Sequence, residues 1–460
     1  MTDERSHSTV ASDGRKISLI IVVVSAGVLL GLIFLARGNT LPMHSVNDRS
    51  RWATVYSLAE NGTYQIDETP WPMTIDRVQL NGHFYSSKPA LLPTLLAGEY
   101  LILKKLSFGR LNFHDSPEAV IRIIVASVNL LPMVIFLTLY SHFLDRLSLD
   151  LWVRTYAMVA AGLGTYLTAF SITLNNHTIA AFSCFFALYT AFLIWSEERR
   201  DSWLFAANGF FAAFTAVNEF PAASLLAVLA LALWRKAAQK TVAFFLPFAL
   251  IPLAAHFYTN YKVTGSFEPP YAKKKAYDFP GSYWKIDPAT GRLVGSKTDP
   301  TTGQVTLNVT SEIDNQYEPW YVYLFHMLVG HHGIFSLSPI FVFTVLGTIL
   351  LLREPANPLR HLAFSTVALT VILFIFYLFF AGQRNYGGMC NGLRWLFWLI
   401  PLWLMSLPVG LQHRSSSQWF RGLALAFLAI SAVSTFYATR NPWTRPWLHE
   451  FLYYVGWIKY

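Results

Sequence analysis

Long apolar runs, most of them bounded by Lys or Arg, constrain this chain of 460 residues more than any other feature. About 20 helical residues span the ~30 Å hydrocarbon core of a bilayer, and residues 17–35 contain no charged side chain. Only 13% of the residues are charged, against about 25% in a typical soluble protein. The sequence therefore predicts an all-α polytopic membrane protein. The net charge of +9 indicates basic cytoplasmic loops rather than nucleic acid binding.

The apolar pattern predicts about eleven transmembrane helices, with the N-terminus in the cytoplasm and the C-terminus outside. They are expected at 17–35, 119–143, 153–174, 178–195, 203–217, 222–234, 241–257, 333–352, 361–381, 394–411 and 422–437. This orientation follows from the positive-inside rule. The short connections expected inside carry Lys or Arg, whereas those at 175–177 and 218–221 carry none.

The spans divide the chain into three parts. Residues 1–16 are expected to be a disordered cytoplasmic tail, 17–437 the transmembrane domain, and 438–460 an external C-terminal tail. Within the domain, 37–118 forms the first external loop and 258–332 a large external loop before the eighth span.

The first external loop should contain interfacial helices. Residues 51–60 have the pattern of a short amphipathic helix lying along the membrane surface. Residues 90–103 are apolar but end at a Lys-Lys pair, so we expect a second interfacial or re-entrant helix. Cys184 lies in an apolar run and Cys390 in a short loop, which favours neither a disulfide framework nor a cysteine zinc site.

Unusual polar residues collect on the face expected outside. They are Asp48, Lys88, Asn176, His177, Glu219, His331, His332, Arg384, Tyr386 and Arg394. Chance would scatter such residues over both faces. We therefore predict a binding or active site at the outer membrane boundary.

Each of these residues also has an ordinary structural interpretation. Asp48 could cap the following helix, Lys88 could be a lysine that extends its head to the interface, and Arg394 could be an interfacial anchor. Residues 175–177 could be a simple polar turn. The adjacent His331-His332 pair is expected to point in two directions on a regular helix or strand, so a structural or headgroup-binding role is favoured over a metal pair.

Two motifs in this order resemble the membrane glycosyltransferases of the C superfamily (GT-C), which include the protein O-mannosyltransferase and bacterial aminoarabinose transferase branches. The first comprises an acid soon after the first span and a G-x-x-Y-x-x-K-P-x-L stretch, matched here by Asp48, Gly82, Tyr85, Lys88, Pro89 and Leu91. The second is YGGMCNGLRW, residues 386–395, near the last spans. GIFSLSPIF, residues 333–341, is similar to the stretch after the large external loop of these enzymes. Together with the span order, the resemblance covers most of residues 17–411.

The resemblance implies transfer of a sugar from a polyprenyl-phosphate-linked donor to a lipid, glycan or protein acceptor at the outer face. Asp48 is then the candidate general base, with Lys88, Arg384 and Arg394 near the phosphate, where cations stabilise growing negative charge. Tyr386, His331, His332, Asn176, His177 and Glu219 are further candidates for binding substrate. A bacterial inner membrane, with the site on the periplasmic side, is the expected location.

The sequence also departs from the family pattern. Asp48 is followed by Arg49 where Asp-Glu is common, Ser87 replaces a Glu before Lys-Pro, and Asn176-His177 stand where an acid is often found. With fewer carboxylates, a divalent cation cofactor is not favoured, although Asp48 could bind one.

Two other functions remain open from the sequence. A transporter or flippase would need charged residues near mid-bilayer, where they are costly and usually functional, and the predicted spans hold almost none. The second alternative is a non-catalytic membrane scaffold with an external domain. Turnover of a polyprenyl-phospho-sugar by the purified protein would separate these alternatives from the enzyme.

Overall fold

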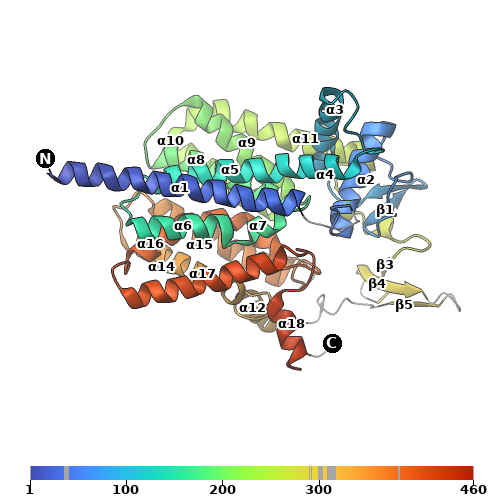
Figure 1. Cartoon of the computed structure of the whole chain (residues 1–460). Helices are drawn as coiled ribbons and strands as arrows, with labels where there is room; N and C mark the ends of the chain where they lie inside the picture. Colours follow the sequence, from blue (N-terminus) through green and yellow to red (C-terminus); the bar gives the residue numbers. More distant parts are fainter. Residues whose placement is uncertain are drawn as a thin grey trace.

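The computed structural model describes residues 2–35, 41–289, 291, 293–298, 304–307, 318–381 and 384–458, with side chains from residue 13 onward except those of 297 and 298. Long helices run side by side and form a bundle (Figure 1). The bundle helices are α1 (Thr2–Phe34), α4 (Pro117–Val125), α5 (Leu131–Leu144), α6 (Leu151–Leu163), α7 (Tyr166–Phe170), α8 (Asn176–Trp195), α9 (Ser202–Asn218), α10 (Ala223–Lys240), α11 (Leu246–Thr264), α14 (Phe341–Arg353), α15 (Arg360–Ile375), α16 (Ile400–Gln412) and α17 (Gln418–Ala438).

Most of the shorter elements, among them α2, α3 and the strands, gather at one end of the bundle, on the right in Figure 1, whereas α12 and α18 lie below the bundle in this view. The short helices are α2 (Val46–Asn61), α3 (Leu91–Leu106), α12 (Trp320–Leu328), α13 (Ile334–Leu337) and α18 (Trp447–Tyr454). Strands β1 (Arg77–Leu80) and β2 (His83–Ser86) form a hairpin, and β3 (Trp284–Ile286), β4 (Leu293–Thr298) and β5 (Val305–Leu307) form an antiparallel sheet in the order β3-β4-β5. Three π turns continue helices into longer ones: η1 (Ala126–Leu130), η3 (Thr241–Phe245) and η6 (Phe376–Phe380). Two short 3-10 turns precede helices, η2 (Phe220–Ala222) and η7 (Arg394–Leu399), and two lie in the loop after α11, η4 (Pro270–Ala272) and η5 (Lys274–Tyr277).

The prediction of an all-α polytopic membrane protein is confirmed. Among the described residues, seven helical stretches are long and apolar enough to cross a membrane: Asp13–Phe34, Pro117–Leu144, Asn176–Trp195, Phe220–Thr264, Arg360–Phe380, Arg394–Gln412 and Gln418–Ala438. Each of the eleven predicted spans contains a helix, and the number of crossings stays a prediction.

The longest of these stretches reverses direction. The stretch Phe220–Thr264 starts at the end of the bundle where α8 begins, because Glu219, just before it, accepts a hydrogen bond from Asn176, the first residue of α8. Lys240 donates to the carbonyl of Arg200 at the other end, and Asn260 is back beside Ala90 at the first end. The backbone of Ala237 leaves the helical region within this stretch, with φ −160° and ψ 76°. The two spans predicted here, 222–234 and 241–257, are therefore two antiparallel helices.

Two predicted spans are interrupted where local chemistry opposes a helix. In 153–174 the helix stops at Gly164, and Thr165 is extended (φ −126°, ψ 153°) before α7 begins. In 333–352 the long helix α14 begins only at Phe341, because Ser338 precedes a proline, and such residues are disfavoured in helices. Its φ of −135° and ψ of 64° end α13.

Two smaller predictions need correction. The tail 1–16, expected to be disordered, is helical from Thr2, because extending an existing helix requires no new nucleus. The helix predicted at 51–60 spans Val46–Asn61, and much of it is buried rather than lying along a surface. The second interfacial or re-entrant segment is helix α3, close to its predicted bounds.

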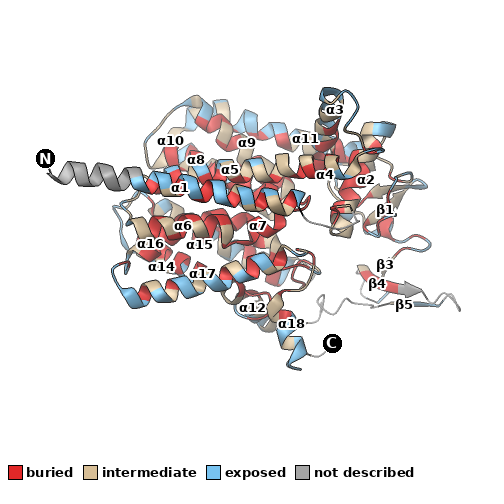
Figure 2. Cartoon of the chain, viewed as in Figure 1, coloured by how far each residue is buried: buried red, intermediate tan, exposed pale blue. Residues whose placement is uncertain are grey.

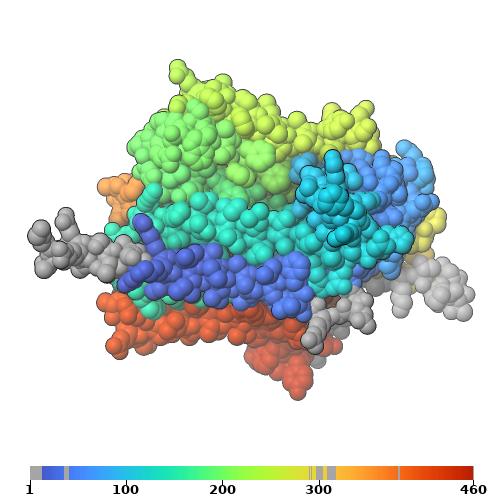
Figure 3. Space-filling view, turned by 45° about the horizontal axis from the view of Figure 1, so that its top comes forward, coloured from blue at the N-terminus to red at the C-terminus, as the bar shows by residue number. Residues whose placement is uncertain are grey.

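Packing in the bundle is that of a membrane protein. Figure 2 shows buried residues along the inner faces of the helices and exposed ones along the outer faces. Many of the exposed residues are large and apolar, such as Leu231 and Leu250. Small residues permit close helix contact: a Cβ on Gly347 of α14 would clash with the carbonyl of Ser406 of α16. Helix α1 lies on the surface of the bundle (Figures 1 and 3).

Candidate active site

Several helix ends meet at the right-hand end of the bundle in Figure 1. Helix α8 starts there with Asn176 and His177, and η7 starts with Arg394. Helix α9 ends at Asn218, followed by Glu219. The hydrogen bonds described below show that the polar side chains at these ends are in contact.

The Asp48 side chain takes part in the N-terminal cap of helix α2. Ser45 is the N-cap, and Asp48 is the third helical residue in a capping box, an arrangement that satisfies otherwise unpaired backbone donors. Its carboxylate accepts from the backbone N–H groups of His44 (2.7 Å), Ser45 (2.8 Å) and Arg49 (2.8 Å). The Thr173 hydroxyl, from the loop before α8, donates at 2.6 Å.

These donors occupy most of the hydrogen-bond acceptor sites of the Asp48 carboxylate. Two carboxylate oxygens offer about four lone-pair sites, and the Ser45 hydroxyl adds a further contact at 3.2 Å. Burial raises the pKa of the Asp48 carboxyl, whereas the bonds from Thr173 and Ser45 oppose that rise. The geometry ties the first turn of α2 to the loop before α8.

A chain of polar contacts begins three residues later, at Arg51. The Arg51 guanidinium donates to the side-chain oxygen of Asn176. Asn176 Nδ2 donates to Glu219 Oε1 at 2.7 Å, and His177 Nδ1 contacts the same oxygen. His177 Nε2 is 2.8 Å from Arg394 Nη1. Residues from four separate segments thus form one buried network.

Arg394 is held by its own neighbours as well. Its Nε donates to the carbonyl of Gly387 at 2.5 Å, and its guanidinium lies 5.0 Å from the centre of the Trp443 ring. Gly387 has φ +99°, and a Cβ there would be 2.9 Å from the Arg394 side chain. The positive φ and this close approach leave no room for a larger residue at position 387.

A hairpin turn positions the Lys88 ammonium. Asn81-Gly82, with φ values of 53° and 86°, form the two-residue loop between β1 and β2, the sequence that such turns favour. Because Arg77 pairs with Ser86, Asp76 lies beside Ser87 and Lys88. Lys88 Nζ is 2.8 Å from Asp76 Oδ2, and the Ser87 hydroxyl donates to Asp76 Oδ1.

The charged side chains at this end of the bundle shift one another's pKa values. Burial lowers the pKa of Arg51 to about 10; Asp76 opposes this effect and Arg394 adds to it. Burial also lowers the pKa of Lys88, with a smaller contribution from Arg51. Burial raises the pKa of Glu219 to about 8, against the opposing effect of Arg394 and Arg51. Three cations and two carboxylates therefore form one electrostatic unit, which we call the cation cluster: Arg51, Lys88, Arg394, Asp76 and Glu219.

Arg384, Tyr386, His331 and His332 belong to a second group. Arg384 donates to the backbone carbonyl of Glu318 at 2.8 Å rather than facing the cation cluster. Both histidines are buried, and the His332 ring stacks on Tyr386 at 4.6 Å. Contrary to the expectation for a regular helix or strand, the Nδ1 atoms of the two histidines are in contact, because the chain turns sharply at this point.

Sequence reasoning did not select two members of the cation cluster. Asp76 had a usable signal, since an Asn-Gly turn at 81–82 pairs position 76 with 87. Arg51 had none, because its partner Asn176 is 125 positions away in the sequence.

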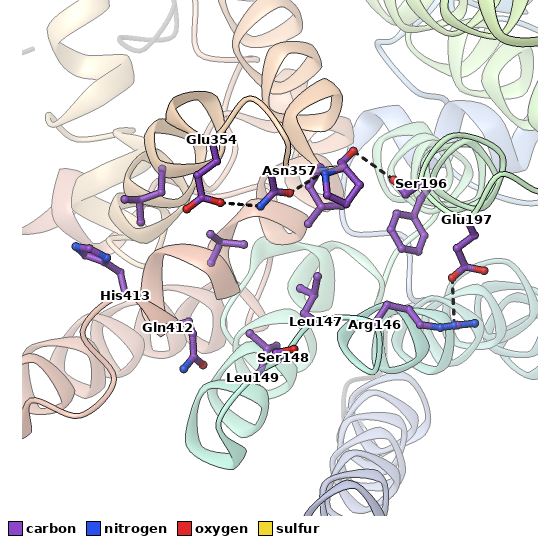
Figure 4. A pocket seen from close by; sticks show the side chains of 15 residues that line it. Arg146, Leu147, Ser148, Leu149, Ser196, Glu197, Glu354, Asn357, Gln412 and His413 are labelled. Carbon is purple, nitrogen blue, oxygen red and sulfur yellow. Dashed lines mark hydrogen bonds and ion pairs between the residues drawn. The ribbon is translucent and has the colours of Figure 1, made fainter. Parts of the chain in front are cut away.

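An open cavity of about 530 Å³ lies at the opposite end of the bundle (Figure 4). Its lining includes Ser196 and Glu197 after the end of α8, and Gln412 at the end of α16, whereas Asn176 and Arg394 stand at the other ends of these segments. Twenty helical residues span about 30 Å, so this cavity is separate from the cation cluster. Glu197 forms an ion pair there with Arg146, at 3.1 Å.

No protein-family model matches the sequence, and no curated protein matches it. Among solved structures, the chain is similar to the crystal structure of the Archaeoglobus fulgidus oligosaccharyltransferase in complex with Zn and sulfate. The TM-score is 0.46 and the identity 13%, over 92% of this chain and 53% of that chain. This chain thus spans about half the length of that protein. The match is a likeness of overall fold and assigns no activity.

Proposed function

We propose that this protein is a membrane glycosyltransferase that moves a sugar from a polyprenyl-phosphate-linked donor to an acceptor at the outer face of the membrane. The observation that carries the proposal is the cation cluster. Arg51, Lys88 and Arg394 gather there at the ends of apolar helices, beside the carboxylates of Asp76 and Glu219.

Such a cluster suits a phosphate leaving group. When the bond from sugar to phosphate breaks, negative charge grows on the phosphate oxygens, and fixed cations stabilise it. Arg394 and Arg51 can each present paired N–H groups to two oxygens, whereas Lys88 acts as a point charge. Three cations drawn from α2, the segment before α3, and η7 form a preorganised anion site.

The location suits a lipid-linked donor. Helices α3 and α11 are in contact and carry exposed apolar and aromatic side chains toward this end, among them Leu95, Tyr258 and Tyr261. An isoprenoid tail could lie along such a surface while its phosphate reaches the cations. We assign the outer face because the lysines and arginines of the short loops mark the opposite face as cytoplasmic.

We propose Glu219 as the proton acceptor. Its Oε1 is engaged by Asn176 and His177, whereas Oε2 has no hydrogen-bond partner among the described residues. A pKa raised to about 8 makes this carboxylate a stronger base than an ordinary one, and general bases work best when their pKa lies near the operating pH. Asp48, the base suggested by the resemblance, has its oxygens occupied by backbone and Thr173 donors.

A matched pair of lysines tests the phosphate-binding role. Lys88 pairs with Asp76 and Lys104 pairs with Glu60, each at 2.8 Å. Lys88→Gln should weaken binding of polyprenyl phosphate and slow turnover of a polyprenyl phosphate-linked hexose by about tenfold or more, the size typical of a lost charged hydrogen bond of ~1.5–3 kcal/mol. Lys104→Gln should leave both unchanged. Equal effects of the two substitutions, or no binding of polyprenyl phosphate by the wild type, would contradict the proposal.

A further inference from the structure

Three side chains with metal-ligating atoms converge at the end of the large external loop. Glu318, His326 and His331 each offer one ligand atom, and these atoms all lie within 4.8 Å of one another. The His326 and His331 rings are nearly parallel, with centroids 3.9 Å apart and an interplanar angle of 22°.

One short segment of backbone creates this arrangement. Glu318 precedes α12, and His326 lies in its last turn. The chain then turns back at Gly330, where a Cβ would overlap the His326 ring. Only glycine lets the backbone pass so close, and this passage brings His331 against His326.

Neighbouring side chains hold the three groups in place. Tyr386 donates to Glu318 Oε2 at 2.5 Å, and His331 Nδ1 contacts His332 Nδ1. Second partners of this kind fix the orientation of metal ligands in known sites. In addition, the buried Nδ1 of His326 has no hydrogen-bond partner within the described part of the chain, and a buried polar atom without a partner calls for an explanation such as an ion.

We propose that Glu318, His326 and His331 bind a first-row transition metal ion, Zn²⁺ in the first place. Two imidazoles and one carboxylate suit Zn²⁺, whereas Mg²⁺ and Ca²⁺ prefer oxygen ligands. Ligand atoms around a tetrahedral Zn²⁺ lie about 3.4 Å apart, as metal–ligand distances of ~2.1 Å require, so small side-chain rotations close the site.

The ion would fasten the two ends of α12 to each other next to the cation cluster. Tyr386, which orients Glu318, is followed by Gly387, whose carbonyl holds Arg394. The metal site adjoins the cation cluster, but it is built from Glu318, His326 and His331 alone and does not depend on the proposed sugar transfer.

Metal content of the purified full chain tests the site directly. After dialysis against metal-free buffer, wild-type protein should retain roughly one Zn²⁺ per chain, as a three-ligand site predicts. Inductively coupled plasma mass spectrometry measures this metal content. His326→Ala and Glu318→Gln should each lower this content more than tenfold. His114→Ala is the control, since this histidine side chain is 93% exposed, and it should change nothing.

A second measurement covers the case in which a variant does not fold. Wild-type protein stripped with a chelator should unfold at a lower temperature, and Zn²⁺ should restore the midpoint, because a ligand that binds the folded state stabilises it. Mg²⁺ at the same concentration should not. Wild type that neither retains Zn²⁺ nor responds to it, variants that retain as much as wild type, or an equal response to Mg²⁺ would each overturn the proposal.

Discussion

Replacing Glu219 with Gln removes a titrating carboxyl and keeps the shape of the side chain. The amide oxygen of Gln can still accept from Asn176 Nδ2, which is 2.7 Å from Oε1 in the wild type, so the network should persist. If Glu219 is the base, turnover should fall about 10²–10⁴-fold, equivalent to about 3–5 kcal/mol of transition-state stabilisation. The assay is release of polyprenyl phosphate from a polyprenyl phosphate-linked hexose, with protein purified in detergent.

The pH profile gives an independent reading of the same residue. A base must be deprotonated, and burial raises the pKa of Glu219 to about 8. Wild-type kcat/KM should therefore rise with pH up to about 8 and then level off. In Glu219→Gln this limb should be absent. A raised carboxyl pKa also favours folding when the group is protonated, so wild type should lose thermal stability relative to Glu219→Gln as pH rises from about 4.5 to about 8.

Asp48→Asn is the companion variant. An amide at this position would direct a donor at backbone donors from His44, Ser45 or Arg49, and each buried polar group left unpaired costs about 1–3 kcal/mol. We expect a lower unfolding midpoint and less folded protein. A stable, inactive Asp48→Asn together with a Glu219→Gln that keeps near-normal turnover and its pH limb would refute this assignment and make Asp48 the base.

Three further predictions concern phosphate, topology and coupling. Arg394→Lys should weaken polyprenyl phosphate binding, because lysine lacks the planar guanidinium that can bind two phosphate oxygens at once. Arg421→Lys is the control and should leave binding unchanged, since Arg421 Nε also donates to a carbonyl and its guanidinium also lies over a Trp ring. Equal binding by both variants would make Arg394 an anchor. In a background without the native cysteines, Cys at exposed Asp115 should react with an impermeant thiol reagent in intact cells and Cys at exposed Ser416 should not; the reverse would place the cation cluster inside. Bound phosphate adds negative charge near Glu219, so the pKa from the kcat profile should exceed that from kcat/KM; identical values would indicate that the two groups do not interact.

The fold was largely predictable because apolar length is a local property. A run of about 20 apolar residues becomes a membrane helix whatever its neighbours are, and all the predicted spans contain helices. The errors lie where one backbone position decides the outcome, as at Thr165 and at Ser338 before Pro339. The helical start of α1 was missed for the opposite reason, since composition alone does not register a helix continuing from the adjacent span.

The candidate site was predictable only in part. Sorting polar residues by face was enough to bring Lys88, Glu219 and Arg394 into one region, because membrane topology reduces the problem to two sides. It could not supply the partners, since the contact from Arg51 to Asn176 depends on how α2 docks against α8. The same limit applied to the histidines, whose contact depends on a turn at Gly330.

The Asp48 carboxylate, whose oxygens accept hydrogen bonds from four donors, has a structural role in this site that does not require it to be a base. It joins the first turn of α2 to Thr173, just before α8. Arg51 is one turn further along α2, and Asn176 opens α8, so this joint fixes the distance between the two. Asn176 in turn holds Glu219 Oε1. We infer that Asp48 is a positioning residue: an acid in this position is needed because only a carboxylate can accept from three backbone N–H groups and a hydroxyl at once while remaining buried.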